Sequence, residues 1–332
     1  MNNKDTYLII YHKEDNDGLF SAAIMFDYLM STFNVDNSQL HLFGATYNDM
    51  NNFDVNKLSS VYDHIIILDL SFNDSKKMKN LYKKMGNNLV WIDHHKPAII
   101  ESTFQKYDDI NGLRNPNHST IILTYQYLYD EFRTNYQHYP EIYKILSAWD
   151  SWSWEDCGYD FEKIKNINQG VNISYQLDFD SILELVKNIK DGVWRDRHER
   201  DWILSMERKG LDYSLIKDYE NKLMIDNYGD LEWVIDFPKN NFNNRSACAL
   251  FIQGPTNSQI FKSIRNVVDN GIIFKRYRNG DWNISLYNTK DDHDFHCGNY
   301  LKEKYGGGGH EGAAGCTITN DQFFNILKTK KL

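Results

Sequence analysis

The chain has 332 residues, enough for two domains with sizeable hydrophobic cores. Its 46 acidic residues outnumber its 37 lysines and arginines, a formal net charge of −9, which disfavours nonspecific binding of long nucleic acids because such binding neutralises many phosphates. No apolar run approaches the roughly 20 residues that span a membrane, and no apolar segment of signal-peptide length follows Met1. The four cysteines form no CxxC pair, so we expect free thiols and a cytoplasmic protein. We expect no membrane partner.

The first predicted strand ends in a cluster of polar side chains. Residues 7–11 form an apolar run typical of a buried strand, and His12 and the acidic turn 13–18 follow it. Residues 18–30 then present a broad apolar face and predict a helix. Strand, turn and helix in this order form the first unit of a parallel α/β layer, and residues 40–44 predict its second strand.

Two more predicted strands, residues 65–68 and 89–92, also end in residues that bind metal ions. Asp69 follows the first, and the triplet Asp93-His94-His95 follows the second. The carboxyl ends of parallel strands lie along one edge of an open α/β sheet, where ligands bind. Carboxylate and imidazole groups together suit Mn²⁺, Zn²⁺ or Fe²⁺. Residues 75–85 predict a crossover helix with lysines on its solvent face.

Helices dominate the rest of the first predicted domain. Ser119 or Thr120 is an ordinary N-cap for a helix over residues 121–128. Another predicted helix ends near Asp150, and residues 160–190 also have a helical pattern. We therefore predict that the parallel sheet has helices on both faces.

A charged segment with interspersed apolar residues, 196–223, predicts a long connecting helix. Beyond it, residues 232–237 predict a strand and residues 246–252 a short helix. Asn279-Gly280 separates two β-type runs, 271–277 and 282–287, which is typical of a hairpin. The second domain is therefore predicted to be a smaller α/β domain with a mixed sheet.

The predicted fold class is α/β throughout. We place the N-terminal domain at residues 1–190, a helical linker at 191–227 and the C-terminal domain at 228–332.

Four consecutive glycines, residues 306–309, stand before His310 and a run of small residues at 312–315. A flexible linker would not continue into such a segment. We interpret it as a tight loop whose N–H groups hold an anion, with His310 donating to a phosphate or stacking on a base. The alternative is a packed turn with a buried structural histidine.

The polar residues that follow the predicted strands, and then Asp150, resemble in order the four motifs of the DHH phosphoesterases. Residues 306–315 are similar to the signature of the associated DHHA1 domain, so the resemblance extends over residues 12–315. It implies two divalent metal ions, with Mn²⁺ our first choice. The matching residues are His12, Asp15, Asp17, Asp69, Asp93, His94, His95 and Asp150.

The resemblance also implies a role for each of these residues. One ion would bind to His12, Asp15 and Asp69, and the other to Asp17, Asp69, His94 and Asp150, with Asp69 bridging. His95 would contact the scissile phosphate or assist the leaving oxygen, and Asp93 would orient His94. The substrate would bind to Gly307, Gly308, Gly309 and His310.

Two departures from the family pattern stand out. Many members have three residues between the first histidine and the first aspartate, whereas two separate His12 from Asp15 here, so that Glu14 could contribute. Many DHHA1 domains have an Arg-Ser pair where this chain has Tyr287-Asn288. The cations that could substitute for the missing guanidinium are Arg245, Lys275, Arg276 and Arg278.

We predict a phosphoric diester hydrolase acting on short RNA or DNA oligonucleotides, similar to the nano-RNases, or oligoribonucleases. Two enzyme alternatives are a phosphodiesterase for cyclic nucleotides or linear dinucleotides and a RecJ-like single-strand exonuclease. The latter is least favoured because the chain is acidic and lacks a recognisable further nucleic-acid-binding domain. A nucleotide sensor is the alternative without catalysis. Oligomeric state is open, with a homodimer among the alternatives.

Overall fold

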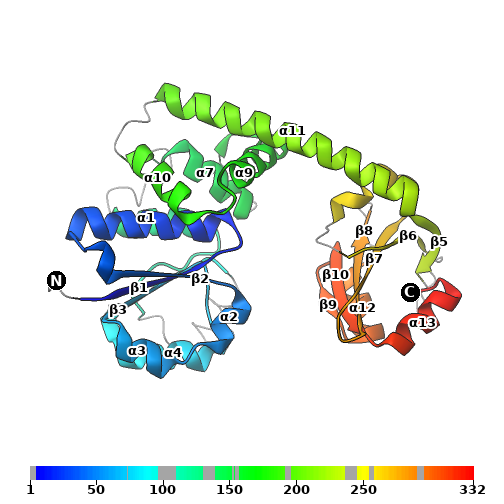
Figure 1. The fold of residues 1–332 in the computed structure, drawn as a ribbon, viewed down its shortest axis with the longest axis horizontal. Coiled ribbons are helices and arrows are strands. Elements are labelled where there is room, and N and C mark those ends of the chain that lie inside the picture. The colour runs from blue at the N-terminus through cyan, green and yellow to red at the C-terminus, as the bar shows by residue number, and fades with distance from the viewer. Residues whose placement is uncertain are drawn as a thin grey trace. The chain divides into compact units, whose positions relative to one another are not determined.

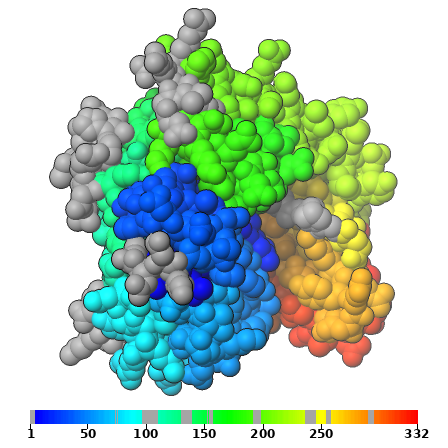
Figure 2. All heavy atoms as spheres, turned by 60° about the vertical axis from the view of Figure 1, so that its left-hand side comes forward, coloured from blue at the N-terminus to red at the C-terminus, as the bar shows by residue number. Residues whose placement is uncertain are grey.

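The computed structural model describes residues 5–72, 74–95, 110–129, 139–151, 153, 157–190, 196–235, 245–253, 258–289 and 295–332. Its backbone is drawn in Figure 1 and all of its heavy atoms in Figure 2. The chain forms two compact units, Met1–Tyr213 and Ser214–Leu332. Each unit is described by itself.

The first unit contains a four-stranded parallel sheet in the order β2-β1-β3-β4. Every strand predicted in this part of the sequence is present. The strands are β1 (Tyr7–His12), β2 (Leu40–Ala45), β3 (His64–Leu68) and β4 (Leu89–Ile92).

Helices cover both faces of this sheet, as predicted (Figure 1). Because successive side chains of a strand point to opposite faces, Ile9 belongs to the core under α1, whereas Ile10 belongs to the core above α3 and α4. Helices in the first unit are α1 (Asn16–Phe33), α2 (Tyr47–Asn52), α3 (Val55–Val61), α4 (Ser75–Met85), α6 (Thr120–Leu128), α7 (Glu141–Asp150), α9 (Phe161–Tyr175) and α10 (Phe179–Lys190).

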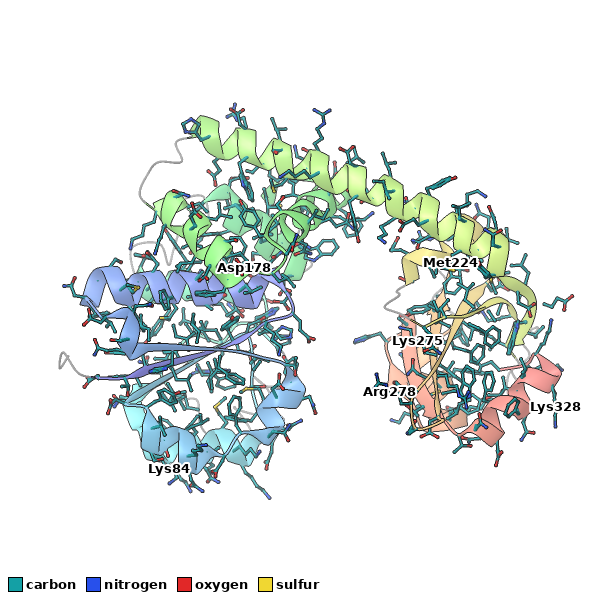
Figure 3. The ribbon with its side chains drawn as sticks, in the orientation of Figure 1. Lys84, Asp178, Met224, Lys275, Arg278 and Lys328 are labelled. Atoms are coloured by element: carbon teal, nitrogen blue, oxygen red, sulfur yellow. The ribbon has the colours of Figure 1, made fainter. Side chains whose placement is uncertain are left out.

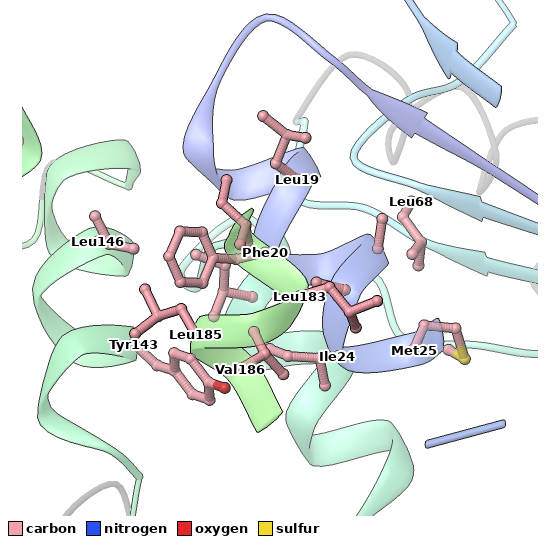
Figure 4. Packing of buried hydrophobic residues seen from close by; sticks show 14 of the residues in the cluster. Leu19, Phe20, Ile24, Met25, Leu68, Tyr143, Leu146, Leu183, Leu185 and Val186 are labelled. Atoms are coloured by element: carbon pink, nitrogen blue, oxygen red, sulfur yellow. The ribbon is translucent and has the colours of Figure 1, made fainter. Parts of the chain in front are cut away.

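The larger core of the first unit lies around α1. Phe20 and Ile24 of α1 are buried with Tyr143 of α7 and with Leu183 and Val186 of α10 (Figure 4). The contact between α1 and α10 brings blue and green surfaces side by side in Figure 2. Burial of this apolar surface holds the start of α1 firmly against the sheet edge where β1 ends.

The second unit contains a six-stranded mixed sheet in the order β5-β6-β7-β8-β10-β9. Among the described residues of this sheet, only β6 and β7 pair in parallel as strands. The predicted hairpin joins β7 to β8, with Gly280 at φ +95°. The elements are β5 (Asp230–Ile235), β6 (Arg245–Phe251), β7 (Asn270–Arg276), β8 (Trp282–Asn288), α12 (Cys297–Tyr305), β9 (Gly308–Gly309), β10 (Ala313–Ile318) and α13 (Asn320–Thr329).

One predicted element is wrong. Residues 246–252 were expected to be a helix, but β6 occupies Arg245–Phe251 and pairs with β5 and β7. Its apolar residues are continuous because β6 lies inside the sheet and is covered on both faces. Residues 236 and 237 of the predicted strand before it lie outside the described residues.

The predicted connecting helix is α11 (Asp196–Tyr228), whose first half packs in the first unit and whose second half packs in the second. The boundary between the compact units falls within it, after Tyr213. The domain limits inferred from the sequence stay a prediction. In the part of the chain that the structure describes, no helix combines the length and apolar character needed to cross a bilayer.

Candidate metal centre

The carboxyl ends of β1, β3 and β4 meet at one edge of the first sheet. In the parallel register Tyr11 is opposite Leu68, and Leu68 is opposite Ile92. The residues immediately after these positions are His12, Asp69 and Asp93, so the topology gathers the three predicted motifs. Gly18 packs tightly against the end of β1, because a Cβ there would lie 2.1 Å from the carbonyl oxygen of His12.

The first group of candidate ligands consists of His12, Asp15 and Asp69. The Nδ1 atom of His12 lies 2.7 Å from Asp15 Oδ2 and 3.6 Å from Asp69 Oδ2. Asp15 is also the N-cap of α1, where its side chain accepts the amide of Gly18 at 3.0 Å. Glu14, the alternative suggested by the short spacing, lies 3.6 Å from His12 Nε2 and is largely exposed.

The second group consists of Asp17, His94 and Asp150, and a further group, Asp69 with His94 and His95, overlaps both. The Nε2 atom of His94 lies 2.9 Å from Asp150 Oδ2, 3.4 Å from Asp69 Oδ1 and 3.7 Å from Asp17 Oδ2. Asp150 is the last residue of α7 and comes to the sheet edge through the packing of that helix. All the ligands that the family resemblance implies therefore lie in two adjoining groups.

Asp69 lies between the two groups. It presents Oδ2 to His12 and Oδ1 to His94, and its side chain is 1% exposed. Its φ of +58° is rare for a residue other than glycine and costs on the order of 1–3 kcal/mol. The Thr120 hydroxyl donates to Asp69 Oδ1 at 3.0 Å, and the Asp69 amide donates to the carbonyl of Ile92 at 3.0 Å. These contacts hold the carboxylate between the groups in spite of the backbone strain.

The start of α6 contributes to the site in a way that the sequence did not reveal. Both carboxylate oxygens of Asp17 accept backbone amides, from Thr120 and Ile121, at 2.8 Å each. The positive end of the helix dipole therefore stabilises the Asp17 anion. Of the two predicted N-caps, Ser119 occupies the N-cap position of α6, and Thr120 is the first residue of the helix, with its amide donating to Asp17.

The electrostatics of the cluster call for bound cations. Burial, and then the charges of Asp69 and Asp150, raise the pKa of Asp17 well above its usual range. Burial disfavours protonation of the imidazoles, but neighbouring carboxylates outweigh it and raise the pKa of His12 to about 10 and that of His94 to about 12. Protons on histidine thus balance carboxylate charge that divalent ions would otherwise balance.

Two buried atoms test whether the residues fit metal ions. His12 Nδ1 lies 2.7 Å from Asp15 Oδ2, and Asp150 Oδ2 lies 2.9 Å from His94 Nε2, yet neither buried atom has hydrogen-bond geometry within the described residues. Nitrogen and oxygen atoms that converge in this way are typical of ligands around a shared ion. The imidazole and carboxylate set fits a divalent transition metal.

His95 and Asp93 differ from the expectation in one respect. Asp93 accepts from the amide of His95 at 3.1 Å and contacts His95 Nδ1 at 2.8 Å, so it orients His95 and not His94. The reason is local, since the amide two residues after an aspartate is within reach of its side chain. Burial lowers and Asp93 raises the pKa of His95, with a net rise. The His95 side chain is 37% exposed, compared with 12% for His94.

Tyr47 is a neighbour of the site that sequence reasoning missed. Its ring centroid lies 5.7 Å from that of His12 and 5.7 Å from that of His95, edge-on to the latter. Burial and then the charge of Asp93 raise its pKa, so the hydroxyl stays neutral. A tyrosine in the first turn of a short helix gives no sequence signal of such a position.

The glycine run of the second unit forms a tight loop, but fewer of its amides are available than expected. The Gly307 amide donates to the carbonyl of Leu301 in α12, and the His310 amide donates to Ala313 where the edge strand β9 turns into β10. A Cβ on Gly307 would meet Cys316 at 2.5 Å, and Gly309 has φ +147°. A Cβ on Gly308 would meet open space. His310 is exposed, which contradicts the alternative of a buried structural histidine.

Of the four cations considered as substitutes, Arg245 lies at the end of the sheet that carries this loop. Its Nε donates to Asn270 Oδ1 at 2.8 Å, and Asn270 donates to Asn288 Oδ1 at 2.8 Å. Asn288 in turn donates to the carbonyl of Glu311 at 3.3 Å. The others lie toward the opposite end of β7, where Figure 3 labels two of them. They are Lys275, Arg276 and Arg278.

Comparisons with known proteins agree with the geometry. Residues 6–148 match the model of the DHH family, N-terminal domain. No curated protein matches the chain. PggH, a pGpG-specific phosphodiesterase from Vibrio cholerae, is similar in structure, with a TM-score of 0.52 and 16% identity over 98% of this chain and 97% of that one. This likeness shows a shared fold.

A second solved structure is RecJ from Thermus thermophilus in complex with Mn²⁺, with a TM-score of 0.49 and 12% identity over 98% of this chain and 51% of that one. The family match covers the part of the chain that holds almost every candidate ligand, from His12 to His94. The part of the chain from residue 6 to residue 148 therefore matches the N-terminal domain of the DHH family.

Proposed function

We propose that the protein is a divalent-metal-dependent phosphodiesterase that hydrolyses short oligonucleotides. The position of Asp69 carries the proposal. Its two oxygens face two different groups of ligands, His12 with Asp15 on one side and His94 on the other. A carboxylate shared in this way is the arrangement that two adjacent metal ions require.

The site residues divide into those that hold metal and those that handle the phosphate. The first ion would bind to His12, Asp15 and Asp69, and the second to Asp17, Asp69, His94 and Asp150. When bound, such ions, with Mn²⁺ our first choice, activate water and stabilise charge on the phosphate.

His95 is the residue best suited to contact the substrate. It is more exposed than His94, and Asp93 fixes its ring through Nδ1, which leaves Nε2 available. The raised pKa of His95 favours the protonated ring. His95 would therefore donate a proton or hydrogen bond to a phosphate oxygen or to the leaving oxygen.

The second unit, which we assign to the DHHA1 type, would bind the substrate through its glycine loop. Gly307 and Gly309 are explained by packing and backbone conformation, but Gly308 is not, because a side chain there would meet open space. A glycine without an internal reason is expected where a ligand approaches the backbone closely. His310 is exposed beside it and could stack on a base or donate to a phosphate.

A linear-dinucleotide phosphodiesterase is the second candidate. It is the activity named for PggH, whose chain and this one match over nearly their full lengths. The two candidates differ in the length of substrate that the site accepts. An acidic chain favours either over a processive exonuclease on long strands.

Product analysis on labelled oligonucleotides of graded length separates these candidates. The same assay includes pGpG, cyclic dinucleotides and 3′,5′-bisphosphate nucleotides, each with Mn²⁺ and after metal removal. We expect metal-dependent cleavage that is fastest on the short oligonucleotides. Cleavage of pGpG alone would select the dinucleotide activity, and full activity without metal would refute the proposal.

Substitutions in the loop test its role in binding. His310→Ala should lower kcat/KM on short oligonucleotides by about 5- to 150-fold, equivalent to about 1–3 kcal/mol for loss of one base or phosphate contact. Hydrolysis of bis-p-nitrophenyl phosphate should change little. Gly308→Ala should raise KM without loss of stability, whereas Gly312→Ala, where a Cβ also meets open space, is the matched control. Equal losses on both substrates would place His310 in the catalytic centre or the fold.

A further inference from the structure

The outward face of α11 exposes more apolar surface than a solvated helix needs. Leu211 is 45% exposed, Leu215 60%, Tyr219 64% and Leu223 41%. The side of α11 that packs inward is the opposite one. It carries the buried Ile203, Met206 and Gly210 in the first unit and Ile225 in the second. Contiguous exposed apolar side chains commonly mark an interaction surface.

The exposed face has the spacing of a coiled-coil seam. Six exposed residues follow one another at steps of four, three, four, three and four, which keeps them on one side of a helix at a period of 3.5. We call these residues the α11 seam. They are Arg208, Asp212, Leu215, Tyr219, Lys222 and Asp226.

The α11 seam is complementary to itself when it is read in reverse. An antiparallel copy centred on residue 217 would place Arg208 opposite Asp226, Asp212 opposite Lys222 and Leu215 opposite Tyr219. Each of these layers then joins either opposite charges or two apolar side chains. In a parallel pair the same residues would repel one another, because like charges would meet: Arg208 would face Arg208 and Asp212 would face Asp212.

We propose that α11 pairs in antiparallel orientation with α11 of a second copy of this chain, about a two-fold axis at residue 217. Leu211 and Leu223 would flank the central Leu215–Tyr219 layers and widen the apolar contact. The α11 seam matches its own surface after a two-fold rotation, which is what an interface between two identical subunits requires. This self-complementarity identifies the binding partner as a second copy of the chain.

The charged layers determine how such a dimer should behave. Arg208 and Asp212 form no ion pair with another described residue, and Lys222 pairs with Asp226 along the helix. All four are exposed, so their attraction across the interface is screened by salt. The dimer should therefore be concentration-dependent and weaker at high ionic strength.

Sedimentation velocity on the full chain, over a range of concentrations at low and high salt, tests the proposal. Wild type should show a dimer that dissociates on dilution. Arg208→Asp and Asp226→Arg should each shift the protein to monomer, because each puts like charges opposite one another. The variant with both substitutions should recover the dimer, and so should an equal mixture of the two single variants.

Leu215→Glu supplies an independent disruption at the centre of the α11 seam, and circular dichroism checks that every variant retains its helix content. Lys209→Asp, on the same helix but outside the seam, is the matched control and should leave the dimer intact. A wild type that is monomeric at all concentrations would overturn the proposal. So would a dimer that is unaffected by Leu215→Glu, or charge reversals that the double variant does not rescue.

Discussion

The central prediction concerns Asp69, the carboxylate that lies between the two ligand groups. Asp69→Asn removes a charged oxygen ligand while leaving the size of the side chain unchanged. Asparagine is preferred to alanine here because Asp69 has φ +58°, a conformation that asparagine, like aspartate, adopts more readily than alanine, for which the cost is about 1–2 kcal/mol. The Thr120 hydroxyl can still donate to the remaining side-chain oxygen. The substitution therefore isolates the loss of the ligand from any loss of fold.

The structure sets the size of the effect. Each group offers three donors, and Asp69 faces both His12 and His94. Four-ligand structural zinc sites bind with about 10–16 kcal/mol, so one ligand is worth about 3–4 kcal/mol on that scale. Asp69→Asn should thus lower the affinity of the protein for each of the two ions by about 100- to 1,000-fold. Asp150→Asn should lower the affinity for the second ion alone, because Asp150 belongs to a single group of candidate ligands.

Metal content and calorimetry measure this difference. Metal-free protein is equilibrated with Mn²⁺ and desalted, and bound metal is counted by mass spectrometry. Wild type should retain about two ions per chain, as a two-metal site requires. Asp150→Asn should retain about one and Asp69→Asn almost none, with turnover lost in proportion. If Asp69→Asn keeps as much metal as Asp150→Asn, the bridging role is refuted.

Three further outcomes follow from the site geometry. His95→Ala should keep its bound metal and lose turnover, whereas His94→Ala should lose both; equal metal loss would show that the two imidazoles are wrongly assigned. Because the pKa of His12 is about 10 and that of His94 about 12 in the metal-free protein, both rings are protonated at neutral pH and must release their protons on binding metal. The apparent affinity should therefore rise with pH by about tenfold per unit for each proton, and calorimetry in buffers of different ionisation enthalpy should detect about two protons; the absence of release would contradict the pairing. Tyr47→Ala should lower kcat by about 10- to 100-fold, as for other residues that support an active group, whereas Tyr47→Phe should keep the ring contact with His95 and most of the activity; equal losses would assign the role to the hydroxyl.

Most of the first domain could be read from local sequence. Three of the four strands are short apolar runs that end at or just before His12, Asp69 or Asp93, and a parallel order of such strands necessarily brings their carboxyl ends to one edge. The hairpin at Asn279-Gly280 could be predicted for a similar reason, because the turn chemistry lies in two adjacent residues. Patterns of this kind depend on near neighbours, so the sequence alone is sufficient.

Other features depend on partners far along the chain. Residues 246–252 are apolar without alternation, and only the neighbours β5 and β7 made them a strand. Asp17 acquires the amides of Thr120 and Ile121 from more than 100 residues away, at a helix start that looked like an ordinary cap.

The assignment of carboxylates to imidazoles was likewise decided by tertiary structure. The order of the motifs predicted which residues would meet, but not that Asp93 would turn to His95, nor that Asp69 would hold a positive φ. Tyr47 reached His12 and His95 only because α2 follows β2, whose end pairs with the end of β1. Side-chain direction in a packed site depends on all its neighbours at once, and a linear sequence does not list those neighbours.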